Sequence, residues 1–90
     1  MELHAYIEAN QERLVRSLQE MVRIPTVNPP GREYLPMVEW LKKACRALGM
    51  KTEVHRVSDE EVAAAEVDPS WPRYNLIARL DCGAKETVHF

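Results

Sequence analysis

The chain has 90 residues, a formal net charge of −2 and a pI near 5.9, with 46% hydrophobic and 29% charged residues. This length allows one small domain, and the mixed composition excludes collagen-like and low-complexity classes. The slightly acidic balance argues against a nucleic-acid binder, and no apolar run reaches the ~20 residues of a membrane span. The first ten residues include acidic side chains, so we expect no secretory signal and a cytoplasmic location.

The first part of the chain predicts two helices joined by a rigid loop. Apolar residues recur at three- and four-residue steps through residues 3–23, which indicates one amphipathic helix. It is expected to end at Ile24, because the residue before a proline disfavours the helical conformation. The segment IPTVNPPGRE then has three prolines and one glycine in ten residues. A second helix is predicted from Glu33, with Gly49 as its left-handed C-terminal residue.

The rest of the chain predicts three strands and one short helix. Residues 50–57 alternate between apolar and polar side chains, as does the stretch YNLIARLD at 74–81, so both are expected to be half-buried strands. Ser58 followed by Glu61 is a capping-box pattern that begins a short helix through the alanines 63–65. A turn near Cys82 and Gly83 then predicts a hairpin into a last strand at KETVHF. The expected order is α-α-β-α-β-β, an α/β layer in which helices cover one face of a partial sheet.

The histidines are the first candidates for metal binding or acid–base chemistry, and they are His4, His55 and His89. His4 lies in the first turn of a helix and His55 on the polar face of a strand. Cys82 lies seven residues before His89 across the expected turn, but two ligands fall short of the four of a structural zinc site. We therefore interpret His89 as a surface histidine and Cys82 as a packed thiol.

Adjacent glutamates serve as base and metal ligand in some hydrolases, which makes Glu60 and Glu61 a candidate pair. The capping box explains Glu61, and Glu60 is then a solvated acid in the first helical turn. Neither a glycine-rich phosphate loop nor a Gly-x-Ser-x-Gly elbow is present. No residue is assigned a catalytic, metal-binding or cofactor-binding role. Packing or a solvated helix surface accounts for the remaining candidates, which are Trp40, Lys42, Lys43, Cys45, Arg46 and Trp71.

The segment LVRSLQEMVRIPTVNPPG, residues 14–31, resembles the N-terminal signature of the M20 metallopeptidase superfamily. Members such as acetylornithine deacetylase and succinyl-diaminopimelate desuccinylase open with a helix, an Ile-Pro-Ser/Thr-Val-Asn-Pro-Pro-Gly loop and a helix ending at Leu-Gly-Phe/Met. A strand follows, and then an Asn-Leu/Val-Ile-Ala-Arg-Leu strand. These features occur here in the same order, so the resemblance covers nearly the whole chain. They are Ile24–Gly31, Leu48–Met50 and Asn75–Leu80.

The resemblance implies that residues 1–90 are the N-terminal portion of a Zn-peptidase-like catalytic domain, without its lid or dimerisation domain. In this superfamily the strand that ETVHF resembles leads into a His-x-Asp metal motif. Two zinc or cobalt ions there activate water for attack on an amide. His89 does not match the motif histidine, because no aspartate stands two positions after it. All the family's metal and catalytic residues are expected beyond Phe90, so the chain alone should bind no metal and be inactive.

Two functional hypotheses follow. In the first, the chain is an N-terminal fragment of a metal-dependent amidohydrolase acting on N-acyl amino acids or short peptides, and its partner is the missing C-terminal remainder. In the second, it is a small interaction module that binds a partner through the unpaired edge of its last strand, KETVHF, which is the open edge of the sheet. Self-association through that edge is also expected, whereas no nucleic-acid or membrane partner is.

Overall fold

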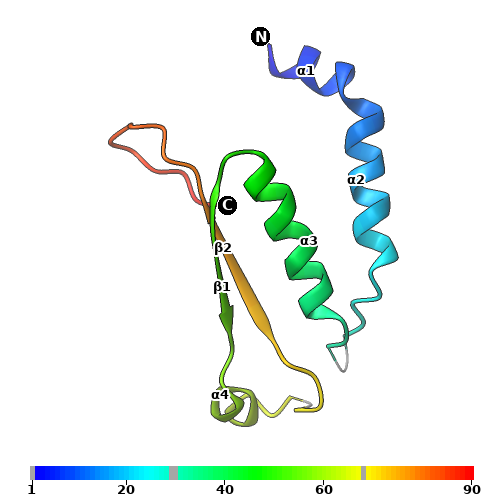
Figure 1. The fold of residues 1–90 in the computed structure, drawn as a ribbon, viewed down its shortest axis with the longest axis vertical. Coiled ribbons are helices and arrows are strands. Elements are labelled where there is room, and N and C mark those ends of the chain that lie inside the picture. The colour runs from blue at the N-terminus through cyan, green and yellow to red at the C-terminus, as the bar shows by residue number, and fades with distance from the viewer. Residues whose placement is uncertain (1, 29–30, 68) are drawn as a thin grey trace.

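The computed structural model describes residues 2–28, 31–67 and 69–90 (Figure 1). Within these residues β1 and β2 form a two-stranded antiparallel sheet, in which Lys51 lies opposite Arg79 and Arg56 opposite Tyr74. This mixture of helices and strands confirms the predicted α/β class at a coarse level. The elements in chain order are α1 (Leu3–Ala9), α2 (Gln11–Arg23), α3 (Tyr34–Ala47), β1 (Lys51–Arg56), α4 (Asp59–Ala64) and β2 (Tyr74–Arg79).

The small core lies where α3 packs along one face of the β1–β2 sheet (Figure 1). Val38 of α3 is only 7% exposed, and Val54 and Leu76 are half-buried on the strands beneath it. The opposite face of β1 is exposed, with Glu53 and His55 forming a contact of 3.1 Å between Oε1 and Nε2. The alternation predicted for the first strand is therefore confirmed.

The N-terminal helix is broken at Asn10, so the prediction of one helix over residues 3–23 is wrong. Asn10 has φ −112° and ψ 15°, outside the helical region, and separates α1 from α2. Its side-chain Nδ2 donates to the carbonyl oxygen of Tyr6 at 2.8 Å, and Nη2 of Arg13 donates to the Tyr6 hydroxyl at 2.6 Å. Asparagine side chains compete with helical backbone hydrogen bonds in this way, which explains the break.

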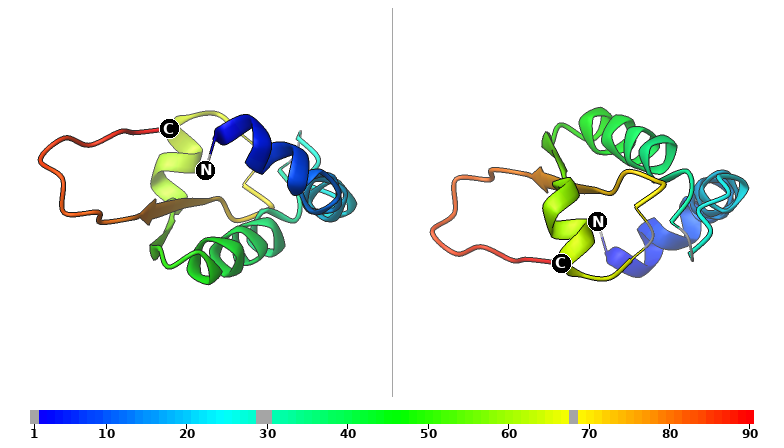
Figure 2. Two further views of the ribbon diagram at one scale, coloured as in Figure 1. Left: turned by 90° about the horizontal axis from the view of Figure 1, so that it is seen from above. Right: turned by 90° about the horizontal axis from the view of Figure 1, so that it is seen from below.

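The α1–α2 arm lies beside α3 and away from the sheet (Figures 1 and 2). A side-chain hydrogen bond joins α3 to α2, donated by Nε1 of Trp40 to Oε2 of Glu20 at 3.1 Å. The apolar side of α2 is open, because Leu14, Leu18 and Val22 are 44%, 58% and 74% exposed. The expectation that helices cover the sheet thus holds for α3 and not for the arm.

Residues 80–90 form an irregular exposed segment, so the predicted third strand and hairpin are wrong. Gly83 has φ +75°, and its N–H donates to Oδ1 of Asp81 at 2.9 Å, which bends the chain as expected near Cys82. Val88 is 76% exposed and Phe90 is fully exposed to solvent. Strand propensity depends on packing against neighbours, and these side chains have none nearby. The order in the described chain is α-α-α-β-α-β instead of α-α-β-α-β-β.

The molecule exposes more surface than its mass predicts. Its accessible surface is 7912 Å², whereas a compact 10.4 kDa monomer exposes about 5,400 Å². Its radius of gyration is 16.3 Å, against about 12 Å for a compact domain of this length. Surface that a compact fold would bury is therefore exposed to solvent on the α1–α2 arm and on the β1–β2 sheet.

Candidate functional site

Backbone hydrogen bonds join the described ends of the proline-rich loop between α2 and α3. The N–H groups of Gly31 and Arg32 both donate to the carbonyl oxygen of Val27, at 2.7 and 3.0 Å. Gly31 is buried and has φ +94°, a conformation that favours glycine. These bonds close the loop upon itself; Pro29 and Pro30 lie outside the described residues.

Two arginines join this loop to the segment that enters β2. The guanidinium of Arg73 lies about 2.9 Å from the position that a Cβ on Gly31 would take, and 5.6 Å from the ring of Tyr34. Arg32 lies 5.8 Å from the ring of Trp71. Such cation–π contacts contribute about 0.5–1 kcal/mol each at exposed sites. The cluster therefore fixes the loop against the sheet, and it contains no nucleophile or general base.

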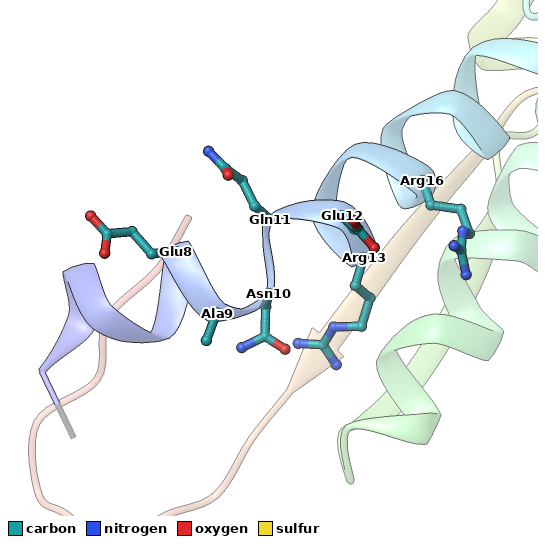
Figure 3. A pocket seen from close by; sticks show the side chains of 7 residues that line it. All are labelled: Glu8, Ala9, Asn10, Gln11, Glu12, Arg13 and Arg16. Atoms are coloured by element: carbon teal, nitrogen blue, oxygen red, sulfur yellow. The ribbon is translucent and has the colours of Figure 1, made fainter.

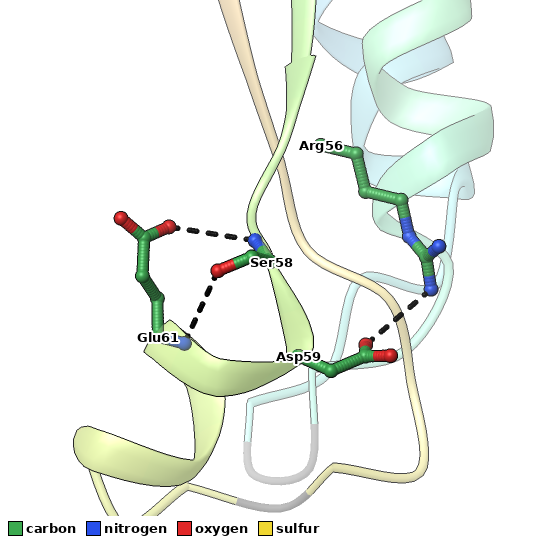
Figure 4. A network of polar contacts seen from close by, with 4 residues as sticks. All are labelled: Arg56, Ser58, Asp59 and Glu61. Carbon is green, nitrogen blue, oxygen red and sulfur yellow. Dashed lines mark hydrogen bonds and ion pairs between the residues drawn. The ribbon is translucent and has the colours of Figure 1, made fainter.

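The Ser58–Glu61 pair forms the predicted capping box at the start of α4 (Figure 4). The N–H of Glu61 donates to Oγ of Ser58 at 3.2 Å, and the N–H of Ser58 donates to Oε2 of Glu61 at 3.4 Å. Arg56 adds an exposed ion pair of 3.7 Å with Asp59. Glu61 thus has the structural role expected of it, and Glu60 is exposed.

The histidines and cysteines do not converge. His4 lies on α1, His55 on β1 and His89 in the irregular segment after β2, and all three are exposed. Cys82 is exposed rather than packed, which corrects the sequence interpretation, whereas Cys45 is half-buried in α3. Over residues 2–28, 31–67 and 69–90, no three His, Cys, Asp or Glu side chains are grouped to hold a metal ion. The residues in this part of the chain therefore do not fit a two-metal centre by themselves.

A shallow hollow lies at the elbow between α1 and α2 (Figure 3). In Figure 3 its side chains fan outward in different directions and do not point toward a common centre. The lining residues are Glu8, Ala9, Asn10, Gln11, Glu12, Arg13 and Arg16.

The sequence interpretation missed the Arg73–Tyr34 and Arg13–Tyr6 contacts. Arginine and aromatic residues are common and the Arg73–Tyr34 pair is far apart in sequence, so no spacing pattern signals it. The interpretation of Trp40 as a packing residue is consistent with its half-buried position against Glu20.

Comparisons with protein-family models, with curated proteins and with solved structures found no match. Among the helices of the described chain, none has the length and apolar character needed to cross a membrane. The function must therefore be argued from the residues of the chain and their arrangement.

Proposed function

We propose that this chain is the N-terminal portion of a cytoplasmic metal-dependent amidohydrolase of the M20 type. The full enzyme would hydrolyse N-acyl amino acids or short peptides, with two zinc or cobalt ions activating the water. The 90-residue chain contributes the scaffold that precedes the metal site and is inactive by itself. Its partner is the C-terminal remainder of the catalytic domain.

The observation behind this proposal is the ordered succession of helix, proline-rich loop, helix and two strands, with family-like sequence at each junction. The loop Ile24–Gly31 is the most specific of these features. Its last residue needs a glycine for two physical reasons, namely φ +94° and the close approach of Arg73. The glycine that ends the family-like loop sequence is therefore also required by the local backbone conformation and packing at Gly31.

The metal chemistry would be supplied by residues outside this chain, because its own His, Cys, Asp and Glu side chains do not gather into a ligand set over residues 2–28, 31–67 and 69–90. What the chain's residues do is structural. Arg73 and Tyr34 hold the loop against β2, and α3 covers one face of the sheet. Such a frame would fix the positions of ligands on elements added next to it.

The test begins with the coding sequence downstream of codon 90. We expect it to encode a His-x-Asp motif and later a Glu-Glu pair, and an extended protein that includes them to hydrolyse N-acetyl or N-succinyl amino acids with zinc or cobalt. The matched control replaces the motif histidine by alanine and should abolish turnover. Unrelated downstream sequence, or stoichiometric metal and amide hydrolysis in the 90-residue chain, would contradict the proposal.

A second candidate is an interaction module that binds a partner strand. Residues 80–90 form no strand, so the edge available for such binding is that of β2 and not the last strand expected from sequence. Extended peptides add to exposed sheet edges through main-chain hydrogen bonds. A monodisperse 90-residue protein whose gene ends in a true stop, followed by unrelated sequence, would favour this function over the first.

A further inference from the structure

The free edge of β2 presents regularly spaced backbone hydrogen-bonding groups, as any outer strand of a sheet does. Val57 N–H donates to the carbonyl oxygen of Arg73 at 2.8 Å, which continues the β1–β2 register as a hydrogen-bonded pair. Such pairs alternate along an antiparallel ladder. Asn75, Ile77 and Arg79 therefore direct their backbone groups toward β1.

The intervening residues Tyr74, Leu76 and Ala78 direct their N–H and C=O groups away from β1, toward the free edge. None of the backbone hydrogen bonds found outside the regular elements in the described chain joins this edge to another segment. Residues 81–90 leave the end of β2 and return toward the strands (Figures 1 and 2), but they are exposed along their whole length. The edge is thus an unpaired strand template.

This edge is complementary to itself. A two-fold axis at Ile77 would place Leu76 opposite Ala78 of a second copy and Tyr74 opposite Leu80, so that the outward-facing residues become hydrogen-bonded pairs. The face that α3 covers would then continue as one apolar surface across both copies. Leu80, on that face, is 56% exposed in the single chain and would gain a cross-strand neighbour. Ile77, on the opposite face, is 39% exposed and would face its own symmetry mate.

The polar face tolerates the same pairing. Asn75 of one copy would lie opposite Arg79 of the other, so no like charges face each other across the axis. The β1 edge is different, because Lys51, Glu53 and Arg56 are exposed along it. A symmetric β1 pairing centred on Glu53 would oppose two carboxylates. Charged residues of this kind protect an edge strand from pairing, and β2 has no such protection over its central residues.

The energetics also favour a partner for this sheet. A two-stranded sheet alone is marginal in water, and among the described elements this one is stabilised by α3 on one face only. Added strands from a second copy would extend that stabilisation. The surface in excess of a compact monomer is about 2,500 Å² per chain, more than the ~800 Å² that each partner contributes to a standard stable interface.

We propose that two copies of this chain pair through β2 around a two-fold axis at Ile77, forming a continuous four-stranded antiparallel sheet in the order β1-β2-β2-β1. Each copy places its α3 on the same face of that sheet. The proposal concerns the 90-residue chain and does not depend on the hydrolase origin proposed above.

Sedimentation and light scattering of the 90-residue protein over a wide concentration range test the assembly. We expect a reversible species of twice the 10.4 kDa chain mass. Ala78→Pro removes an outward N–H and should raise the dissociation constant roughly tenfold or more. Thr52→Pro is the matched control, because Thr52 lies opposite Ala78 and its N–H points to the β1 edge; it should leave the dissociation constant unchanged.

A cross-linking experiment keeps the proposal testable if a proline variant fails to fold. In a background with Cys45→Ala and Cys82→Ser, Ile77→Cys should form an intermolecular disulfide under mild oxidation, since opposed residues at the axis lie about 4.5 Å apart between Cα atoms. Glu53→Cys is its control, because Glu53 lies opposite Ile77 on β1 and far from the axis. A monomer at every concentration, including one whose own tail covers β2, would overturn the proposal. Equal cross-linking of both variants would do the same.

Discussion

The α3–sheet unit and the α1–α2 arm are built from similar amphipathic patterns but differ in what they bury. α3 places Val38 against the strands at 7% exposure, whereas every residue of α2 is exposed or only half-buried. Leu18, at the centre of the α2 apolar stripe, is 58% exposed. Amphipathic spacing therefore indicates that a helix has an apolar face but does not tell what covers it. Among the described helices, α3 packs on the sheet and α4 buries Val62 at 6% exposure, whereas α1 and α2 bury no residue.

The largest effect is expected from introducing a charge into each apolar face. Val38→Asp buries an unpaired carboxylate between α3 and the sheet, and should lower the free energy of unfolding by roughly 3 kcal/mol or more. Leu18→Asp introduces a carboxylate on the exposed face of α2 and should change the free energy of unfolding by less than about 0.5 kcal/mol. Urea denaturation followed by circular dichroism measures both. A comparable loss in the two variants would mean that the arm is as buried as α3.

A smaller effect is expected where the loop meets the sheet. Gly31→Ala must tolerate φ +94° and displace the Arg73 guanidinium, so it should cost about 1–3 kcal/mol. Gly49→Ala is the matched control, because Gly49 has a similar φ of +85° but nothing lies within 4 Å of its added Cβ, and it should cost about 1 kcal/mol. Equal losses in thermal or urea unfolding would show that the Arg73 contact does not hold the loop.

The cap of α4 tests a local contribution on the ordered side of the molecule. Ser58→Ala removes the acceptor for the Glu61 N–H and should cost about 1 kcal/mol. Glu61→Gln keeps an acceptor for the Ser58 N–H, so its loss in the free energy of unfolding should be less than half that of Ser58→Ala. Urea midpoints of the two variants give the comparison, and an unchanged midpoint for Ser58→Ala would mean that α4 is not folded in solution.

The smallest effect is expected at the break in the arm. Asn10→Ala removes the hydrogen bond to the Tyr6 carbonyl and favours a continuous helix, so helical circular dichroism should rise slightly. Because the arm buries little, the free energy of unfolding should change by less than about 0.5 kcal/mol. A loss above 1 kcal/mol would instead show that the bent arm is required by the fold.

The features predicted well from sequence are those fixed by a few neighbouring residues. The Ser58–Glu61 box, the left-handed Gly49 and the alternation of β1 all depend on local backbone chemistry. The wrong predictions concern places where a side chain competes with backbone hydrogen bonds, or where the structure depends on residues distant in sequence. Asn10 interrupts an otherwise continuous apolar stripe through a side-chain bond, and residues near Phe90 have strand propensity without a strand beside them. The Arg73–Gly31 approach joins segments far apart in sequence, so no motif predicts it.

Residue-resolved amide hydrogen exchange of the 90-residue protein tests the contrast between the two regions most directly. Amides of α3 around Val38 and the β2 amides of Ile77 and Arg79, which face β1, should be the most protected, because they open only with the core. Amides of α2 should exchange at nearly the rate of an isolated helix, since a short helix without packing is marginal in water. Protection of α2 equal to that of α3 would contradict the account, because it would require the arm to be packed against a partner.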